Sequence, residues 1–107
     1  MPVSPWRVGQ LSPTWTILMI RDNNTVMNLT NVTTEQLNLI IYNSSKTVTG
    51  TGAGTFNIAS AVPGIVTYQL NSADVPNAVG QYYFRVEVNF NGITPDYCDY
   101  ISWIIQS

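Results

Sequence analysis

The alternation of apolar and polar side chains over residues 80–92 constrains the fold of this chain more than any other feature. The apolar members share one parity: Tyr82, Phe84, Val86, Val88 and Phe90. The other parity carries Tyr83, Arg85, Glu87 and Asn89. Because successive strand side chains point to opposite faces, this pattern predicts a strand with one buried, aromatic-rich face and one wet face. A helix would bring charges into its apolar stripe, so we expect the central strand of a β-sandwich, ended by a hairpin signal at Asn91-Gly92.

Short β-forming segments separated by turn signals account for the rest of the chain. They span residues 14–20, 26–29, 36–42, 46–49, 55–59, 65–70 and 96–106. The turns between them are rich in Asp, Asn, Pro and Gly, and Pro63-Gly64 suits a type II turn. Single helical turns are expected within 30–35 and 71–76. The pattern therefore predicts an all-β, immunoglobulin-like sandwich of seven to eight mostly antiparallel strands over residues 14–107.

Parity also predicts which side chains face the core in the other strands. The expected inward residues are Leu37, Leu39 and Ile41, then Val66, Tyr68 and Leu70, then Ile101, Trp103 and Ile105. Residues 36–42 carry Ile40 and Tyr42 on the opposite face, so this strand is expected to be covered on both sides.

Residues 1–13 are expected to form an extended N-terminal arm, because Pro2, Pro5 and Pro13 favour extended backbone. Two interpretations stay open for its apolar residues. They cover one end of the domain, or the arm docks on a neighbouring subunit. In the second case Trp6, with Arg7 and Val8 beside it, is the anchor.

The composition limits the classes of function. The 107 residues suffice for one domain, and only 9% of them are charged, against about 25% in an average protein. A net charge of −2 with four scattered basic residues argues against nucleic acid as a partner. No apolar run approaches a membrane span or a signal peptide, and the single cysteine, Cys98, excludes an internal disulfide. We therefore expect synthesis in a reducing cytoplasm, with a homo-oligomer as an open alternative because the charge that resists self-association is low.

Residues for chemistry are scarce. The chain has no histidine, so neither a Ser-His-Asp nor a Cys-His arrangement can be built. Asp96 and Asp99 are expected on opposite faces of the last strand, and Asp22 opens an ordinary Asx turn in preference to a calcium loop. Cys98 is interpreted as a buried, inert thiol. We expect no enzyme, with no catalytic, cofactor-binding or metal-binding residues.

Two aromatic side chains are expected outside the core. Tyr83 lies on the wet parity of residues 80–92, and Tyr100 lies on the less apolar parity of the last strand. If these strands pair, the two rings form a patch for a protein or a glycan. The plainer interpretation is cross-strand packing on a solvated face.

Three stretches together resemble a known family. They are Asn28-Leu29-Thr30 with the apolar strand 37–42, the segment Gly64-Ile65-Val66-Thr67-Tyr68-Gln69-Leu70, and residues 80–88. Their order and spacing over residues 14–105 are similar to the immunoglobulin-like N-terminal domain of phage baseplate upper proteins and related virion modules. The resemblance implies an immunoglobulin-like fold, no catalytic residues, and a structural role in the virion after synthesis in the host cytoplasm.

The same resemblance implies capsid, tail or baseplate proteins as partners. Baseplate upper proteins continue into a long stalk, whereas this sequence ends at Ser107. We therefore expect a stand-alone module, either a capsid decoration protein or a tail or baseplate accessory subunit. A carbohydrate- or host-receptor-binding module is the alternative.

Overall fold

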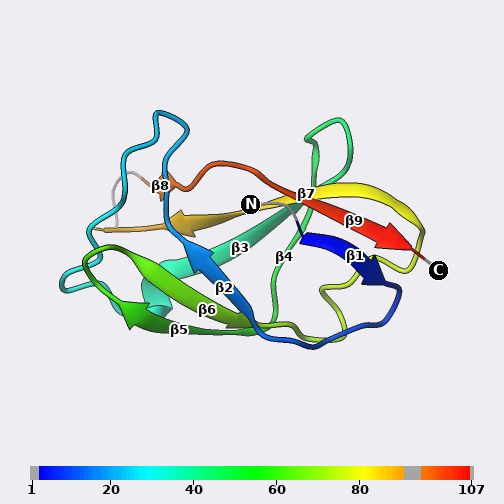
Figure 1. Ribbon diagram of the computed structural model, residues 1–107, viewed down its shortest axis with the longest axis horizontal. Coiled ribbons are helices and arrows are strands. Elements are labelled where there is room, and N and C mark those ends of the chain that lie inside the picture. The colour runs from blue at the N-terminus through cyan, green and yellow to red at the C-terminus, as the bar shows by residue number, and fades with distance from the viewer. Residues whose placement is uncertain (1–2, 91–94, 107) are drawn as a thin grey trace.

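The structure is a computed structural model that describes residues 3–90 and 95–106 (Figure 1). Its strands are β1 Val3–Arg7, β2 Trp15–Leu18, β3 Leu37–Tyr42, β4 Val48–Thr51, β5 Thr55–Ser60, β6 Ile65–Gln69, β7 Gly80–Val88, β8 Asp96–Tyr97 and β9 Ile101–Gln106. A single 3-10 turn, η1 Thr34–Gln36, starts after Thr33, which confirms the helical turn expected near residues 30–35. In these described ranges no helix is long and apolar enough to cross a membrane.

The strands form two sheets, which confirms the expected all-β, mostly antiparallel architecture. The larger sheet has the order β1-β9-β7-β3-β4, and β8 pairs with the end of β7. The smaller sheet has the order β2-β6-β5. All pairings are antiparallel except that of β1 with β9, which is parallel. As predicted, β7 lies in the interior of its sheet, between β3 and β9.

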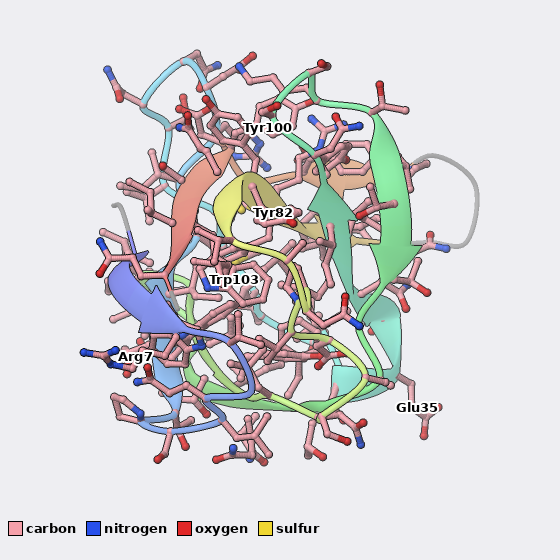
Figure 2. The ribbon with its side chains drawn as sticks, turned by 90° about the vertical axis from the view of Figure 1, so that its right-hand side faces the viewer. Arg7, Glu35, Tyr82, Tyr100 and Trp103 are labelled. Carbon is pink, nitrogen blue, oxygen red and sulfur yellow. The ribbon has the colours of Figure 1, made fainter. Side chains whose placement is uncertain are left out.

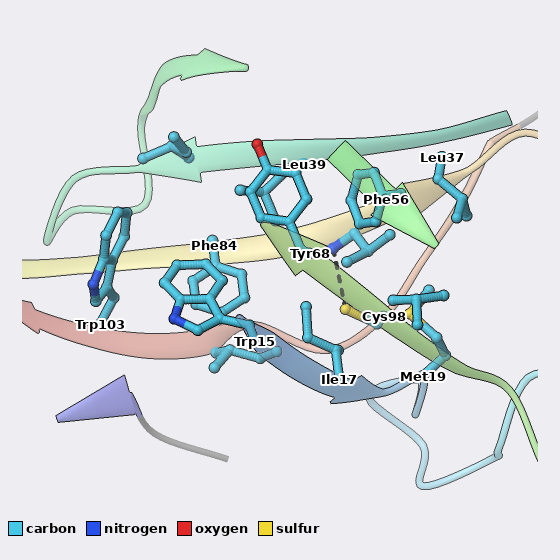
Figure 3. Packing of buried hydrophobic residues seen from close by; sticks show 14 of the residues in the cluster. Trp15, Ile17, Met19, Leu37, Leu39, Phe56, Tyr68, Phe84, Cys98 and Trp103 are labelled. Atoms are coloured by element: carbon cyan, nitrogen blue, oxygen red, sulfur yellow. Dashed lines mark hydrogen bonds between the residues drawn. The ribbon is translucent and has the colours of Figure 1, made fainter. Parts of the chain in front are cut away.

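The core lies between the two sheets and is centred on aromatic rings (Figure 3). Trp15 of β2 stacks on Phe84 of β7 with ring centroids 4.3 Å apart, and Trp103 of β9 meets Trp15 edge-on at 5.0 Å. Such aromatic pairs contribute about 0.5–1.5 kcal/mol beyond the area they bury. All the inward residues predicted for β3, β6 and β9 are buried. Within the central strand Phe84, Val86 and Val88 are buried as predicted, whereas Phe90 lies beyond the end of β7 and is 36% exposed.

The N-terminal segment belongs to the sheet and is not a free arm. Residues 3–7 form β1, which pairs with β9, and the Trp6 side chain is only 4% exposed. The Trp6 ring meets Trp15 edge-on at 5.6 Å, and its Nε1–H donates to the carbonyl of Gln10. Of the two open interpretations, the structure shows the one in which Trp6 packs against its own domain.

The strand predicted over residues 26–29 is wrong. Only one bridge, Ile20 to Val26, forms there, although Met27 and Leu29 are buried. The Met27 N–H donates to the Met19 carbonyl, whereas the Leu29 N–H donates to Ala61. Because consecutive backbone bonds of this segment go to different partners, no continuous ladder develops.

The last predicted strand is interrupted between β8 and β9. The Cys98 N–H donates to the Val86 carbonyl of the larger sheet, but the Asp99 N–H donates to Ile20, next to the smaller sheet. This departure changes the parity, so Cys98 is buried while Asp99 is exposed. The hairpin signal Asn91-Gly92 lies outside the described residues.

Gly64 is needed for space and not for its backbone conformation. A type II turn would require a positive φ at Gly64, and its φ is not positive. A Cβ at this position would instead lie 2.6 Å from the Met27 carbonyl oxygen. The type II prediction is therefore wrong, and the glycine permits close approach of two backbone segments.

A buried carboxylate organises the connection between β6 and β7, where a helical turn was expected over residues 71–76. Asp74 is 3% exposed and accepts hydrogen bonds from the Tyr68 hydroxyl at 2.6 Å and from the backbone N–H groups of Ala53 and Asn71 at 2.6 and 2.9 Å. The Tyr68 hydroxyl in turn accepts from the Gly54 N–H at 2.7 Å. These bonds hold the segment as a turn without helix.

Candidate binding surface on the outer face of the larger sheet

Four tyrosines and two cations gather on the face of the larger sheet that points away from the core. We call them the tyrosine–cation cluster: Tyr42, Lys46, Tyr83, Arg85, Tyr97 and Tyr100. Strand pairing brings them together, because Tyr83 of β7 lies opposite Tyr42 of β3. Tyr83 and Arg85 share the outward parity of β7, so both side chains leave the sheet on the same side.

Arg85 lies at the centre of the cluster. Its guanidinium carbon is 4.0 Å from the ring centroid of Tyr97, 4.5 Å from that of Tyr100 and 5.3 Å from that of Tyr42. Its Nε–H also donates to the Tyr42 hydroxyl at 2.7 Å. A cation over an aromatic face contributes about 0.5–1 kcal/mol at exposed sites. These contacts bury Tyr42 on the outer face, so β3 is covered on both sides at this residue, as expected.

Lys46 reaches the cluster from the turn between β3 and β4. The Asn43 side chain accepts from the N–H groups of Ser45 and Thr47, and Lys46 itself has a positive φ of 61°. This turn places the Lys46 Nζ 4.7 Å from the Tyr100 ring and 5.1 Å from the Tyr83 ring. Both Lys46 and Arg85 therefore contact rings, while an ion pair joins Arg21 to Asp96.

A shallow hollow of about 210 Å³ opens beside Arg85. Arg85, Tyr97, Tyr100 and the Arg21–Asp96 pair contribute to its lining. The Arg21 and Asp96 side chains approach to 2.7 Å and are both partly exposed, so their pair contributes at most about 1 kcal/mol. Partial burial and a hydrogen bond to Glu87 raise the pKa of the Tyr97 phenol above its ordinary value.

The structure separates the predicted binding residues into two places. It brings Tyr83 and Tyr100 together, with ring centroids 6.2 Å apart. Arg7 lies at a different end of the domain (Figure 2), and it is exposed, as is Val8 next to it. Trp6 lies in the core and is therefore not on the surface.

Sequence reasoning missed four members of the cluster. The alternation in residues 80–88 already indicated that Arg85 points outward. The alternation in residues 36–42 indicated the same for Tyr42. Nothing local distinguished Tyr97, because the break after β8 changes the parity. Lys46 had no signal either, since its contacts depend on how the turn folds over the sheet.

Three carboxylates and a thiol also line the hollow beside Arg85, from Asp22, Asp96, Asp99 and Cys98. In the described ranges, no three of the Cys, Asp and Glu residues lie close enough to hold a metal ion. Burial raises the pKa of the Cys98 thiol to about 11, and its Sγ accepts from the Val86 N–H (Figure 3). The exposed parts of the tyrosine rings and the two cations offer aromatic and charged contacts to a partner.

Comparison of the chain with protein-family models, with curated proteins and with solved structures gave no match.

Proposed function

We propose that this chain is a non-enzymatic structural protein of a bacteriophage virion. It is an immunoglobulin-like module on the particle surface, either a capsid decoration protein or a tail or baseplate accessory subunit. It binds other virion proteins through the tyrosine–cation cluster, after synthesis in the host cytoplasm. The observation that carries this proposal is the packing of Arg85 among three tyrosine rings on an outer sheet face.

The order of the strands supports the immunoglobulin-like assignment. In that fold one sheet contains strands C, F and G and the other contains B, E and D. Here the orders β9-β7-β3 and β2-β6-β5 correspond to G-F-C and B-E-D, with β4 beside β3 as an additional C′ strand. Together with the resemblance of three sequence stretches to phage virion modules, this order supports the structural role.

The composition of the cluster supports a protein as its partner. Tyrosine and arginine are enriched among the residues that dominate binding energy at protein interfaces. The tyrosines bring large rigid rings that lose little conformational freedom on binding. The low charge of the whole chain supports short-range contact over long-range attraction to a polyanion.

Co-sedimentation with phage particles tests the proposal. Purified protein is mixed with particles that lack it, and the bound fraction is measured for the unaltered chain and for Tyr83→Ala and Tyr100→Ala. We expect saturable binding that each substitution weakens at least about tenfold. Glu35→Gln is the control, because Glu35 is exposed and lies far from Tyr100 (Figure 2). No binding, or equal binding of all variants, would contradict the proposal.

A carbohydrate- or host-receptor-binding role is the second candidate. The hollow beside Tyr97 and Tyr100 favours it, since rings and polar groups at the rim of a hollow can hold a sugar. Against it, the cations Arg85 and Lys46 both lie over the Tyr100 ring, which a sugar would need for stacking. A glycan array distinguishes the two: binding that Tyr100→Ala abolishes, without binding to particles, would replace the first proposal by this one.

A further inference from the structure

The smaller sheet has an open edge at β2. Its strand order places β2 at one margin, next to β6 alone (Figure 1). The Met19 N–H donates to the Gly64 carbonyl at 2.8 Å, so the alternation of an antiparallel ladder turns Ile17 toward β6 and turns Thr16 and Leu18 away from it. In the described part of the chain, no hydrogen bond reaches the outward N–H and C=O groups of Thr16 and Leu18.

The margins formed by β1, β4 and β5 carry features that discourage further pairing. β1 contains Pro5 and Arg7 and pairs with β9 in an irregular register. The register of β4 shifts at Tyr42, and that of β5 shifts before Ser60. Proteins commonly protect sheet edges by proline, charge and bulges. β2 pairs in an unbroken register and has no charged residue or proline, so it is the unprotected edge.

A hollow of mixed lining adjoins this edge. It measures about 290 Å³; Leu18, Ile20, Cys98 and Ile101 form its apolar part, and Asn24, Asp99 and Tyr100 complete the lining. The Leu18 side chain is 40% exposed there. A strand that pairs with β2 could form backbone hydrogen bonds with Thr16 and Leu18. This hollow would lie beside that strand and could accept one of its apolar side chains.

One backbone hydrogen bond from elsewhere in the chain already reaches this side of the sheet, just beyond the end of β2. The Asp99 N–H donates to the outward carbonyl of Ile20 at 2.7 Å, after which the segment turns away into β9. An added strand must therefore end beside Leu18. The β2 of a second copy, paired antiparallel with Thr16 opposite Leu18, would bring its Thr14 to the place beside Ile20 that Asp99 already occupies. A single extended segment, which can stop or turn there, fits this edge better than another folded copy.

We propose that the open edge of β2 binds an extended, uncharged segment of a partner protein, which adds as a fourth strand to the smaller sheet. Backbone hydrogen bonds supply the attraction, and the hollow beside Leu18 selects an apolar side chain. This inference goes beyond the proposed function, because the edge would accept such a strand whatever particle or assembly the partner belongs to.

A peptide titration followed by NMR tests the inference. The probe is acetyl-Thr-Val-Thr-Val-Thr-Val-amide, and the control is the same peptide with an N-methyl group on every residue, which removes the residue N–H donors on both edges. We expect saturable shifts at the Thr16 and Leu18 amides and at least about tenfold slower hydrogen exchange there. The N-methylated peptide, which has no residue N–H left to donate on either edge, should produce neither effect.

Two variants locate the binding. Leu18→Pro removes an outward N–H without removing a ladder bond, and Leu18→Lys keeps the N–H but adds a charge at the edge. Both should lower the affinity at least about tenfold. Glu35→Gln should leave it unchanged, because Glu35 is exposed and lies outside both β2 and the tyrosine–cation cluster.

Three outcomes would overturn the inference. The first is the absence of saturable shifts at Thr16 and Leu18 up to about 1 mM peptide. The second is equal binding of the N-methylated control. The third is a dimer in sedimentation velocity that Leu18→Lys dissociates, since this would assign the edge to a second copy of the chain.

Discussion

Replacing Asp74 by Asn tests whether the buried carboxylate stabilises the fold. Its Oδ1 accepts from the Ala53 N–H, and its Oδ2 accepts from both the Tyr68 hydroxyl and the Asn71 N–H. An amide has one oxygen and one NH2 group. Whichever way the Asn side chain turns, its NH2 group faces at least one of these donors.

The expected cost follows from the number of bonds lost. If the NH2 group takes the place of Oδ1, the Ala53 N–H loses its acceptor. If the NH2 group takes the place of Oδ2, it faces two donors, the Tyr68 hydroxyl and the Asn71 N–H. Each hydrogen bond to a charged group contributes about 1.5–3 kcal/mol, and an unsatisfied buried donor costs about 1–3 kcal/mol. Since the amide will choose the cheaper orientation, we expect Asp74→Asn to lower the free energy of unfolding by about 2–4 kcal/mol. That loss is a large fraction of the roughly 5–15 kcal/mol that small domains have.

Urea unfolding at neutral pH, followed by tryptophan fluorescence, measures this loss. Asp22→Asn is the matched control, because Asp22 is exposed and its replacement should change stability by less than about 0.5 kcal/mol. Tyr68→Phe completes a double-mutant cycle, in which we expect a coupling energy of at least about 1 kcal/mol between Tyr68 and Asp74. A cost below about 0.5 kcal/mol for Asp74→Asn, or additive effects in the cycle, would refute the reasoning.

Three further predictions concern stability. Gly64→Ala should cost about 1–3 kcal/mol in thermal unfolding, because its Cβ would lie 2.6 Å from the Met27 carbonyl oxygen, while Gly50→Ala, with nothing within 4 Å, should cost less than about 1 kcal/mol. Burial raises the pKa of the Cys98 thiol to about 11 in the folded state, against 9.0 ordinarily. The free energy of unfolding of the parent should therefore fall as the pH rises from about 9 to about 11, and this fall should be about 2 kcal/mol smaller in Cys98→Ala. Arg85→Gln should cost about 0.5–2 kcal/mol in urea unfolding through its lost ring contacts, and an unchanged midpoint would contradict the cation–ring geometry.

Burial along single strands could be predicted from the sequence because it depends on a local rule. Phe84 and Val86 alternate with Tyr83 and Arg85, and the period of two assigns each pair to one face wherever the strand stays regular. The prediction of one unbroken strand over residues 96–106 failed at residues 98–100, where the Asp99 N–H bonds to Ile20 next to the smaller sheet. The alternation of side chains within one segment cannot predict such a hydrogen bond, because the bonding partner is distant in the sequence.

The candidate site could be predicted only in part for the same reason. Tyr83 and Tyr100 were recognised as outward rings, but their approach to 6.2 Å depends on the pairing of β7 with β9. Lys46 joins them from a turn that Asn43 holds through its side chain. Trp6 shows a further limit of prediction from sequence. An apolar residue near the terminus could contact a partner or lie in the core, and only the tertiary packing determines which of the two occurs.

The two faces of β7 make the proposed binding surface separable from the stability of the fold. Phe84 and Val86 are fully buried, whereas Tyr83 and Arg85 on the alternate parity are half-buried and contact only the outer face. Removing a buried aromatic ring costs about 3–5 kcal/mol, but truncating Tyr83 leaves the core untouched and should cost about 1 kcal/mol or less. A loss of particle binding in Tyr83→Ala can therefore be attributed to the surface itself. The same logic holds at β2, where Ile17 is buried and Leu18 next to it is exposed, so that each proposed contact can be removed while the fold that presents it remains.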